Sequence, residues 1–141
     1  MDKNLKYKYI KLIFDGEAED LLKYGMWLSG VDGEGTWVEW YYNPNGDSSI
    51  YKRIEFKNHK MEGEYASYFR KGRLIDHTYY TKNKEDGEFK NFQVDGSIRN
   101  HLWYKKGNIV KNFITDPGAK KDYNLKPGYI LGSNGKYYKD I

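Results

Sequence analysis

Apolar and polar positions along this chain follow a repeated aromatic pattern that ends each time in a glycine. Three copies align, at residues 36–46, 64–72 and 88–96, and the last two start 24 residues apart, at 64 and 88. A weaker fourth copy spans 8–16. A fixed internal period indicates one supersecondary unit stacked on itself.

Each copy is typical of the first strand and turn of a β-hairpin. Asn-Gly and Asp-Gly are strong hairpin signals, because a two-residue type I′ turn needs positive φ at both central residues. The expected turns are Asp15-Gly16, Asn45-Gly46, Lys71-Gly72 and Asp95-Gly96. The expected second strands are 50–57, 74–82 and 98–105, and polar links follow at 58–63 and 83–87.

We therefore predict an all-β fold, an open, twisted antiparallel β-meander of stacked hairpin repeats in a single domain, 1–141. The repeats would occupy 8–34, 35–62, 63–86 and 87–111. Residues 17–24 fit either a short helix or a second strand, and the period favours the strand. Residues 112–141 would form an irregular C-terminal cap or degenerate repeat, with a fifth strand and turn at 129–135. Such a cap would protect an end of the array, since exposed sheet edges invite pairing.

The pattern resembles the MORN-repeat family in its short bacterial variant, over roughly residues 8–111. The residues that carry the resemblance are Gly35-Thr36-Trp37 with Trp40 and Gly46, Gly63-Glu64-Tyr65 with Tyr68 and Gly72, and Gly87-Glu88-Phe89 with Phe92 and Gly96. Lys111 and Asn112 stand where a next Gly-Glu pair would be. The resemblance implies an elongated β-meander that acts as an interaction scaffold, in bacteria often with an antitoxin-like annotation, and it implies no catalytic residues.

The composition of the chain indicates where in the cell the protein is expected. Aromatic residues make up 18% of the chain, and the net charge is +4. Acids predominate from 17 to 46, and lysines from 101 to 141. There is no cysteine, no signal peptide is visible and no apolar run approaches a membrane span, so we expect a soluble cytoplasmic protein.

The hairpin register predicts which side chains share a face. A two-residue turn at Asp95-Gly96 would place Phe92 opposite Arg99, and Lys90 opposite His101. The partner-binding face would carry Trp40, Tyr68, His77, Tyr79, Phe92, Arg99, His101 and Trp103. The other face, more apolar and expected to form the core side, would carry Trp37, Tyr65, Phe69, Leu74, Tyr80, Phe89, Ile98, Leu102 and Tyr104. A bulge or a longer turn would reverse this assignment.

Candidate chemistry is sparse. His77 and His101 occupy equivalent positions on adjacent hairpins, about 9–10 Å apart, too far to share one metal ion without a third ligand. Glu64 and Glu88 are also equivalent, which indicates a role in the repeat rather than in catalysis. Residues 132–136 faintly resemble a phosphate loop but lack its first glycine and its Ser/Thr, so they predict a turn. We predict no metal, no cofactor and no enzymatic activity. A deep pocket holding two convergent carboxylates or a His–carboxylate pair would be the structural sign of an enzyme.

We therefore expect a non-catalytic protein-binding module, a small inhibitor or antitoxin-like protein that occludes an effector such as a toxin or nuclease. The alternative is a single-stranded nucleic-acid-binding protein that stacks bases on aromatic rings and contacts phosphates with lysines. Its lysines would be Lys105, Lys106, Lys111, Lys120, Lys121 and Lys126. Unpaired sheet edges also predict homodimerisation edge to edge as a second mode of association.

Overall fold

The computed structural model describes residues 11–14, 22–31, 33–42 and 48–141, and most of these residues lie in β-strands. The strands of the main sheet are β1 (Lys11–Phe14), β2 (Leu22–Val31), β3 (Glu34–Tyr42), β4 (Ser48–Lys57), β5 (Lys60–Tyr68), β6 (Leu74–Thr81), β7 (Lys84–Glu85), β8 (Gly87–Phe92), β9 (Ile98–Lys105) and β10 (Asn108–Asn112). After them come the 3₁₀ helix η2 (Pro117–Asp122) and the strands β11 (Tyr129–Leu131) and β12 (Tyr137–Lys139).

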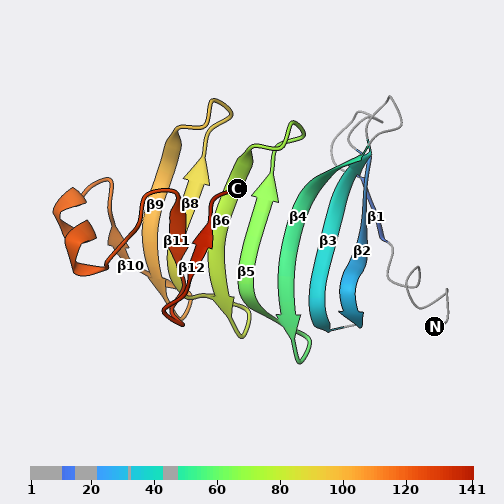
Figure 1. The fold of residues 1–141 in the computed structure, drawn as a ribbon, viewed down its shortest axis with the longest axis horizontal. Helices are drawn as coiled ribbons and strands as arrows, with labels where there is room; N and C mark the ends of the chain where they lie inside the picture. Colours follow the sequence, from blue (N-terminus) through green and yellow to red (C-terminus); the bar gives the residue numbers. More distant parts are fainter. Residues whose placement is uncertain (1–10, 15–21, 32, 43–47) are drawn as a thin grey trace.

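The main sheet is an antiparallel meander. Its strands are ordered β1-β2-β3-β4-β5-β6-β8-β9-β10, and the short β7 also pairs with β6. Each strand therefore lies beside its neighbour in sequence, and the sheet stays open rather than closing into a barrel (Figure 1). This confirms the predicted fold class, including the second strands expected at 74–82 and 98–105.

Two turn types alternate along the meander. The links Asn58-His59 and Lys82-Asn83 are tight two-residue turns with positive φ at both positions, 50° and 62° in the first and 48° and 70° in the second. The glycine turns are longer. The Gly96 amide donates to the Gln93 carbonyl and the Gln93 amide to the Ser97 carbonyl, which leaves a three-residue loop with Gly96 at φ 91°.

The two-residue turn predicted at Asp95-Gly96 is therefore wrong, and so is one pair derived from it. Phe92 pairs with Ile98 rather than with Arg99. A bulge between Asn91 and Phe92 absorbs the extra loop residue, so Lys90 still pairs with His101 as predicted. The same loop and bulge in the preceding hairpin place Leu74 opposite Tyr68, which moves Leu74 to the other face.

One row of paired residues crosses the sheet and defines the face that we call the covered face. Its members, from β3 to β9, are Val38, Arg53, Ala66, His77, Lys90 and His101. By the alternation of side chains, Glu64, Tyr79, Glu88 and Trp103 point to the same side. The opposite side, the open face, carries Trp37, Ile54, Tyr65, Thr78, Tyr80, Phe89, Leu102 and Tyr104.

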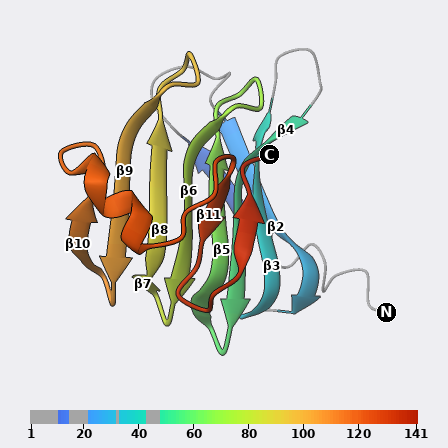
Figure 2. The ribbon, with the colours of Figure 1, turned by 60° about the vertical axis from the view of Figure 1, so that its left-hand side comes forward.

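Residues 113–141, the C-terminal segment, fold back over the covered face. The hairpin β11–β12 contacts β8 and β6 through β11 and lies in front of these strands in Figure 1, and Gly132 bridges to Gly87. The turned view shows the same hairpin in front of the sheet (Figure 2). Tyr138 stacks on Tyr79, with ring centroids 5.7 Å apart. The fifth strand and turn predicted at 129–135 are confirmed, but the segment covers a face of the array instead of capping its end.

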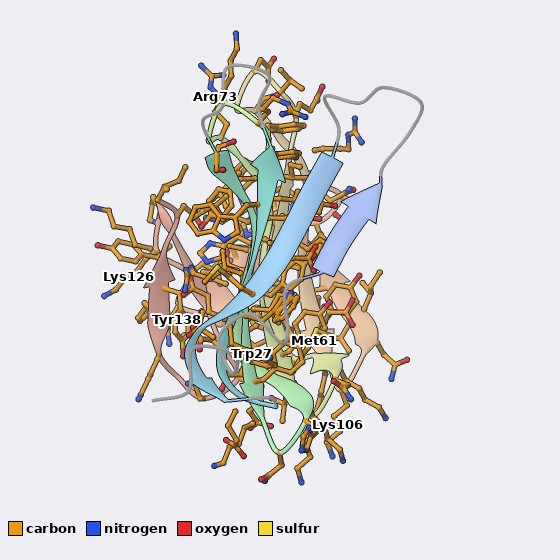
Figure 3. All side chains as sticks on the ribbon, turned by 90° about the vertical axis from the view of Figure 1, so that its right-hand side faces the viewer. Trp27, Met61, Arg73, Lys106, Lys126 and Tyr138 are labelled. Atoms are coloured by element: carbon orange, nitrogen blue, oxygen red, sulfur yellow. The ribbon has the colours of Figure 1, made fainter. Side chains whose placement is uncertain are left out.

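The open face lies on the other side of the sheet. Seen edge-on, Lys126 and Tyr138 lie on one side and Met61 on the other, towards which the N-terminal strands curl (Figure 3). Trp27, Ile54 and Leu102 are buried here, whereas Tyr65, Tyr80, Phe89 and Tyr104 keep part of their surface exposed. The prediction that this face is the core side is therefore wrong for β5 to β9, because there residues 113–141 bury the covered face instead.

Some predictions fall outside the described residues. They include the turns Asp15-Gly16 and Asn45-Gly46, and residues 17–21 of the segment 17–24 for which a helix or a strand was considered. The rest of that segment, residues 22–24, belongs to the strand β2. Within the described ranges, no helix has the length and apolar character needed to cross a membrane.

Candidate functional site

Two carboxylate–histidine pairs lie on the covered face at equivalent positions of successive repeats. Nε2 of His77 lies 2.6 Å from Oε2 of Glu64, and Nε2 of His101 lies 2.6 Å from Oε2 of Glu88. In both pairs the glutamate precedes the histidine by 13 residues. The repeat therefore builds the same pair twice, which agrees with the prediction that Glu64 and Glu88 serve the repeat.

His77 is held between two carboxylates. Its second ring nitrogen, Nδ1, lies 2.6 Å from Oδ1 of Asp140, and the side chain is 1% exposed. Burial alone would lower the pKa of His77, but the hydrogen bonds to Asp140 and Glu64 outweigh it and raise the pKa above its ordinary value. The charged imidazolium can donate to both carboxylates at once.

Two further cations complete this cluster. Nη2 of Arg53 donates to Glu64 (2.9 Å), and Nζ of Lys90 donates to Asp140 (2.8 Å) and to the Tyr129 carbonyl (2.9 Å). Burial would raise the pKa of Glu64 and of Asp140, but His77 and these cations lower both. We call Arg53, Glu64, His77, Lys90 and Asp140 the charge cluster. It joins strands β4, β5, β6 and β8 to the C-terminal end of the chain.

The second pair also holds the C-terminal segment. Glu88 is 1% exposed, and its Oε1 accepts the main-chain N–H of Leu131 (2.8 Å). The His101 ring packs against Phe113 with centroids 4.9 Å apart. Among the described residues, Nδ1 of His101 has no hydrogen-bond partner.

A cavity of about 580 Å³ opens beside this pair, between β8–β9 and the C-terminal segment. Its lining residues are Glu88, Lys90, Ile98, His101, Lys120, Lys121, Asn124, Leu125, Lys126, Pro127 and Gly128. A histidine oriented by a carboxylate beside a cavity is the arrangement of a general base. No hydroxyl or thiol side chain appears among the described lining residues, so a nucleophile for such a base would have to be water or a group of the ligand.

Most of the predicted partner-binding residues lie on or beside the covered face, and several are not exposed. His77, Tyr79 and His101 are buried at 1%, 7% and 6% exposure, and Trp103 packs on Tyr123 of the C-terminal segment. Of the others, Trp40, Tyr68 and Phe92 are half-buried and Arg99 is exposed. The expectation that this row faces solvent is therefore wrong where residues 113–141 cover it.

The charge cluster contains residues that sequence reasoning missed. The hairpin pattern predicts that Lys90 pairs with His101 but gives Lys90 no role, and it gives no indication of Arg53 or Asp140. The 13-residue Glu–His spacing, present twice at the repeat period, was a signal available in the sequence. Nothing comparable indicated Asp140, because its position depends on the return of residues 113–141 across the sheet.

The open face combines aromatic pairs with carboxylates. Tyr65 contacts Tyr80 at 5.5 Å and Phe89 contacts Tyr104 at 5.6 Å between ring centroids. Asp76 accepts from Asn91 (2.6 Å), and burial together with Asp76 and Glu85 raises the pKa of Tyr80. Farther along, Glu39 accepts from the Trp37 indole (3.0 Å), and Lys52 lies over Tyr51 and Tyr65.

No protein-family model matches the chain, and no curated protein is detectably similar to it. Within the described residues, no group of three or more His, Asp or Glu side chains could hold a metal ion. Any function must therefore be argued from the covered and open faces themselves.

Proposed function

We propose that this protein is a non-catalytic protein-binding module, of the inhibitor or antitoxin-like kind, and that its open face occludes an effector protein. The observation that carries the proposal is the row of partly exposed rings on the face opposite residues 113–141. Tyrosine and other aromatic side chains supply much of the energy at protein interfaces, because they bury a large area at a small entropy cost. The MORN-like repeat fits such a scaffold by analogy only.

The charges on the open face favour one kind of partner. Glu39, Asp76 and Glu85 lie on this face among its rings, together with Lys52. Carboxylates would repel a phosphate backbone but attract lysine and arginine side chains. The proposed partner is therefore a protein with a basic and partly apolar surface, which is the surface that nucleases and other nucleic-acid-binding effectors need. The same charges disfavour the alternative of single-stranded nucleic acid on this face.

The test compares the two faces in one assay. A partner captured from the host is purified, and calorimetry measures its dissociation constant with the wild-type protein and two double variants. Tyr65→Ala with Tyr80→Ala should weaken binding by about tenfold or more, whereas Trp40→Ala with Phe92→Ala should stay near the wild type. Circular dichroism confirms that both variants keep their β-structure. The reverse order would place the interface on the opposite side of the sheet.

A second candidate function is favoured by one observation, the Glu88–His101 pair beside the cavity. It would make the protein a hydrolase in which His101 activates water. Hydrolysis of a small activated ester, such as p-nitrophenyl acetate or phosphate, compares the wild type with His101→Gln. Turnover above that of free imidazole that disappears in His101→Gln would replace the non-catalytic proposal.

A further inference from the structure

The cavity beside Glu88 and His101 is surrounded by an excess of positive charge, which the protein-binding role of the open face does not explain. Three lysines stand around it: Lys120 and Lys121 in the last turn of η2, and Lys126 just beyond. Lys90, 5% exposed, also lines the cavity, but its ammonium group is paired with Asp140. Among the described lining residues Glu88 is the one carboxylate, and both of its oxygens are already hydrogen-bonded. The unneutralised charge around the cavity is thus positive.

Several of these groups are held in place. Nζ of Lys126 lies 4.2 Å from the centroid of the Tyr137 ring, so this lysine is positioned by a cation–π contact. Lys90 is fixed by Asp140 and the Tyr129 carbonyl. His101 is oriented by Glu88 through Nε2. Its Nδ1 has no hydrogen-bond partner among the described residues and is not one of their fully buried polar atoms, so it can exchange a hydrogen bond with a ligand in the cavity.

The remaining lining indicates the rest of the ligand. Ile98, Leu125 and Pro127 add apolar surface, and 580 Å³ lies within the usual range for small-molecule sites. Lysine binds phosphate as a point charge, whereas planar carboxylates are typically bound by the paired donors of arginine, which the described lining does not contain.

We propose that this cavity binds a small organic phosphate, with the phosphate group near Lys120, Lys121 and Lys126 and a short apolar or aromatic part against Ile98 and Leu125. The site lies on the covered face, so it goes beyond the proposed protein-binding role of the open face. Residues 113–141 would then both cover the sheet and form the binding site, because they provide most of the cavity wall.

The experiment titrates the full ¹⁵N-labelled chain with phenyl phosphate, inorganic phosphate and benzoate at low salt, followed by amide chemical shifts. Phenyl phosphate should bind most tightly, and the shifts should concentrate at residues 98–101 and 120–128. Lys120→Ala with Lys121→Ala should weaken phenyl phosphate by about tenfold or more. These lysines are exposed, so the double variant keeps the fold.

A matched control separates the site from general charge. Lys136→Ala with Lys139→Ala removes the same charge from exposed lysines of the same segment that do not line the cavity, and it should change the affinity less than about twofold. Equal weakening by both double variants would overturn the proposal. Benzoate binding as tightly as phenyl phosphate, or phenyl phosphate not binding at millimolar concentration, would overturn it too.

Discussion

At the scale of single residues, His77 is the residue that connects the two halves of the charge cluster, Glu64 with Arg53 and Asp140 with Lys90. Five ionisable groups from four strands and the C-terminus form one connected set around it, and each hydrogen bond in the set involves a charge. Removing one member of a buried ionic set leaves its partners uncompensated, which costs more than the intact set contributes. His77 is therefore a structural residue, although its position first suggested a place in an interface.

The shifted pKa values predict a maximum of stability in mildly acidic solution. The raised pKa of His77 gives a stabilising contribution that is complete below its ordinary value of 6.5 and is lost as the pH rises through the raised pKa. The lowered pKa values of Glu64 and Asp140 give a contribution that is present above about pH 4 and is lost as the pH falls through them. Urea denaturation should show the highest free energy of unfolding between about pH 4.5 and 6.5, with a decline towards pH 9.

His77→Gln should remove this alkaline decline and lower the free energy of unfolding at pH 6 by about 3 kcal/mol. The control is His59→Asn, at an exposed turn position with φ 62° that asparagine tolerates, and it should cost less than about 0.5 kcal/mol. A pH profile of His77→Gln that matches the wild type would show that His77 does not carry the effect.

At the scale of elements, the hairpin β11–β12 depends on a close approach to β8. A methyl group added at Gly87 would lie 2.8 Å from the Leu131 carbonyl oxygen, and Gly87 has φ 135°. Gly72 has φ 94°, but a methyl group there meets nothing within 4 Å. Both glycines therefore have a positive φ that other residues rarely adopt, but only Gly87 also contacts β11.

This pair gives a matched test of hairpin docking. Gly72→Ala should lower the free energy of unfolding by about 1–2 kcal/mol, through backbone strain alone. Gly87→Ala should lower it by about 1–3 kcal/mol more, because the added methyl group displaces β11 from the sheet. Urea denaturation measures both; equal costs for the two variants would mean that β11 does not pack against Gly87.

At the scale of the whole molecule, the sheet has one face closed by its own C-terminal segment and one face left with partly exposed rings. The meander was predictable, because aromatic alternation and glycine spacing are local features that repeat. The predicted pairing of Lys90 with His101 is correct because the extra residue in the loop shifts the strand register by one position and the bulge shifts it back. Which face is buried was not predictable from alternation, since it depends on where residues 113–141 return and on Asp140, about fifty positions from Lys90 in the chain.

The assignment of the covered and open faces is tested most directly by nuclear Overhauser contacts between aromatic rings in solution. The structure predicts cross-peaks from Tyr138 to Tyr79, from Phe113 to His101 and from Tyr123 to Trp103, whose ring centroids lie 4.9–5.7 Å apart. It predicts none from these C-terminal rings to Tyr65, Tyr80 or Tyr104. Cross-peaks from Tyr138 or Tyr123 to those three tyrosines would place the C-terminal segment on the other face and contradict the account.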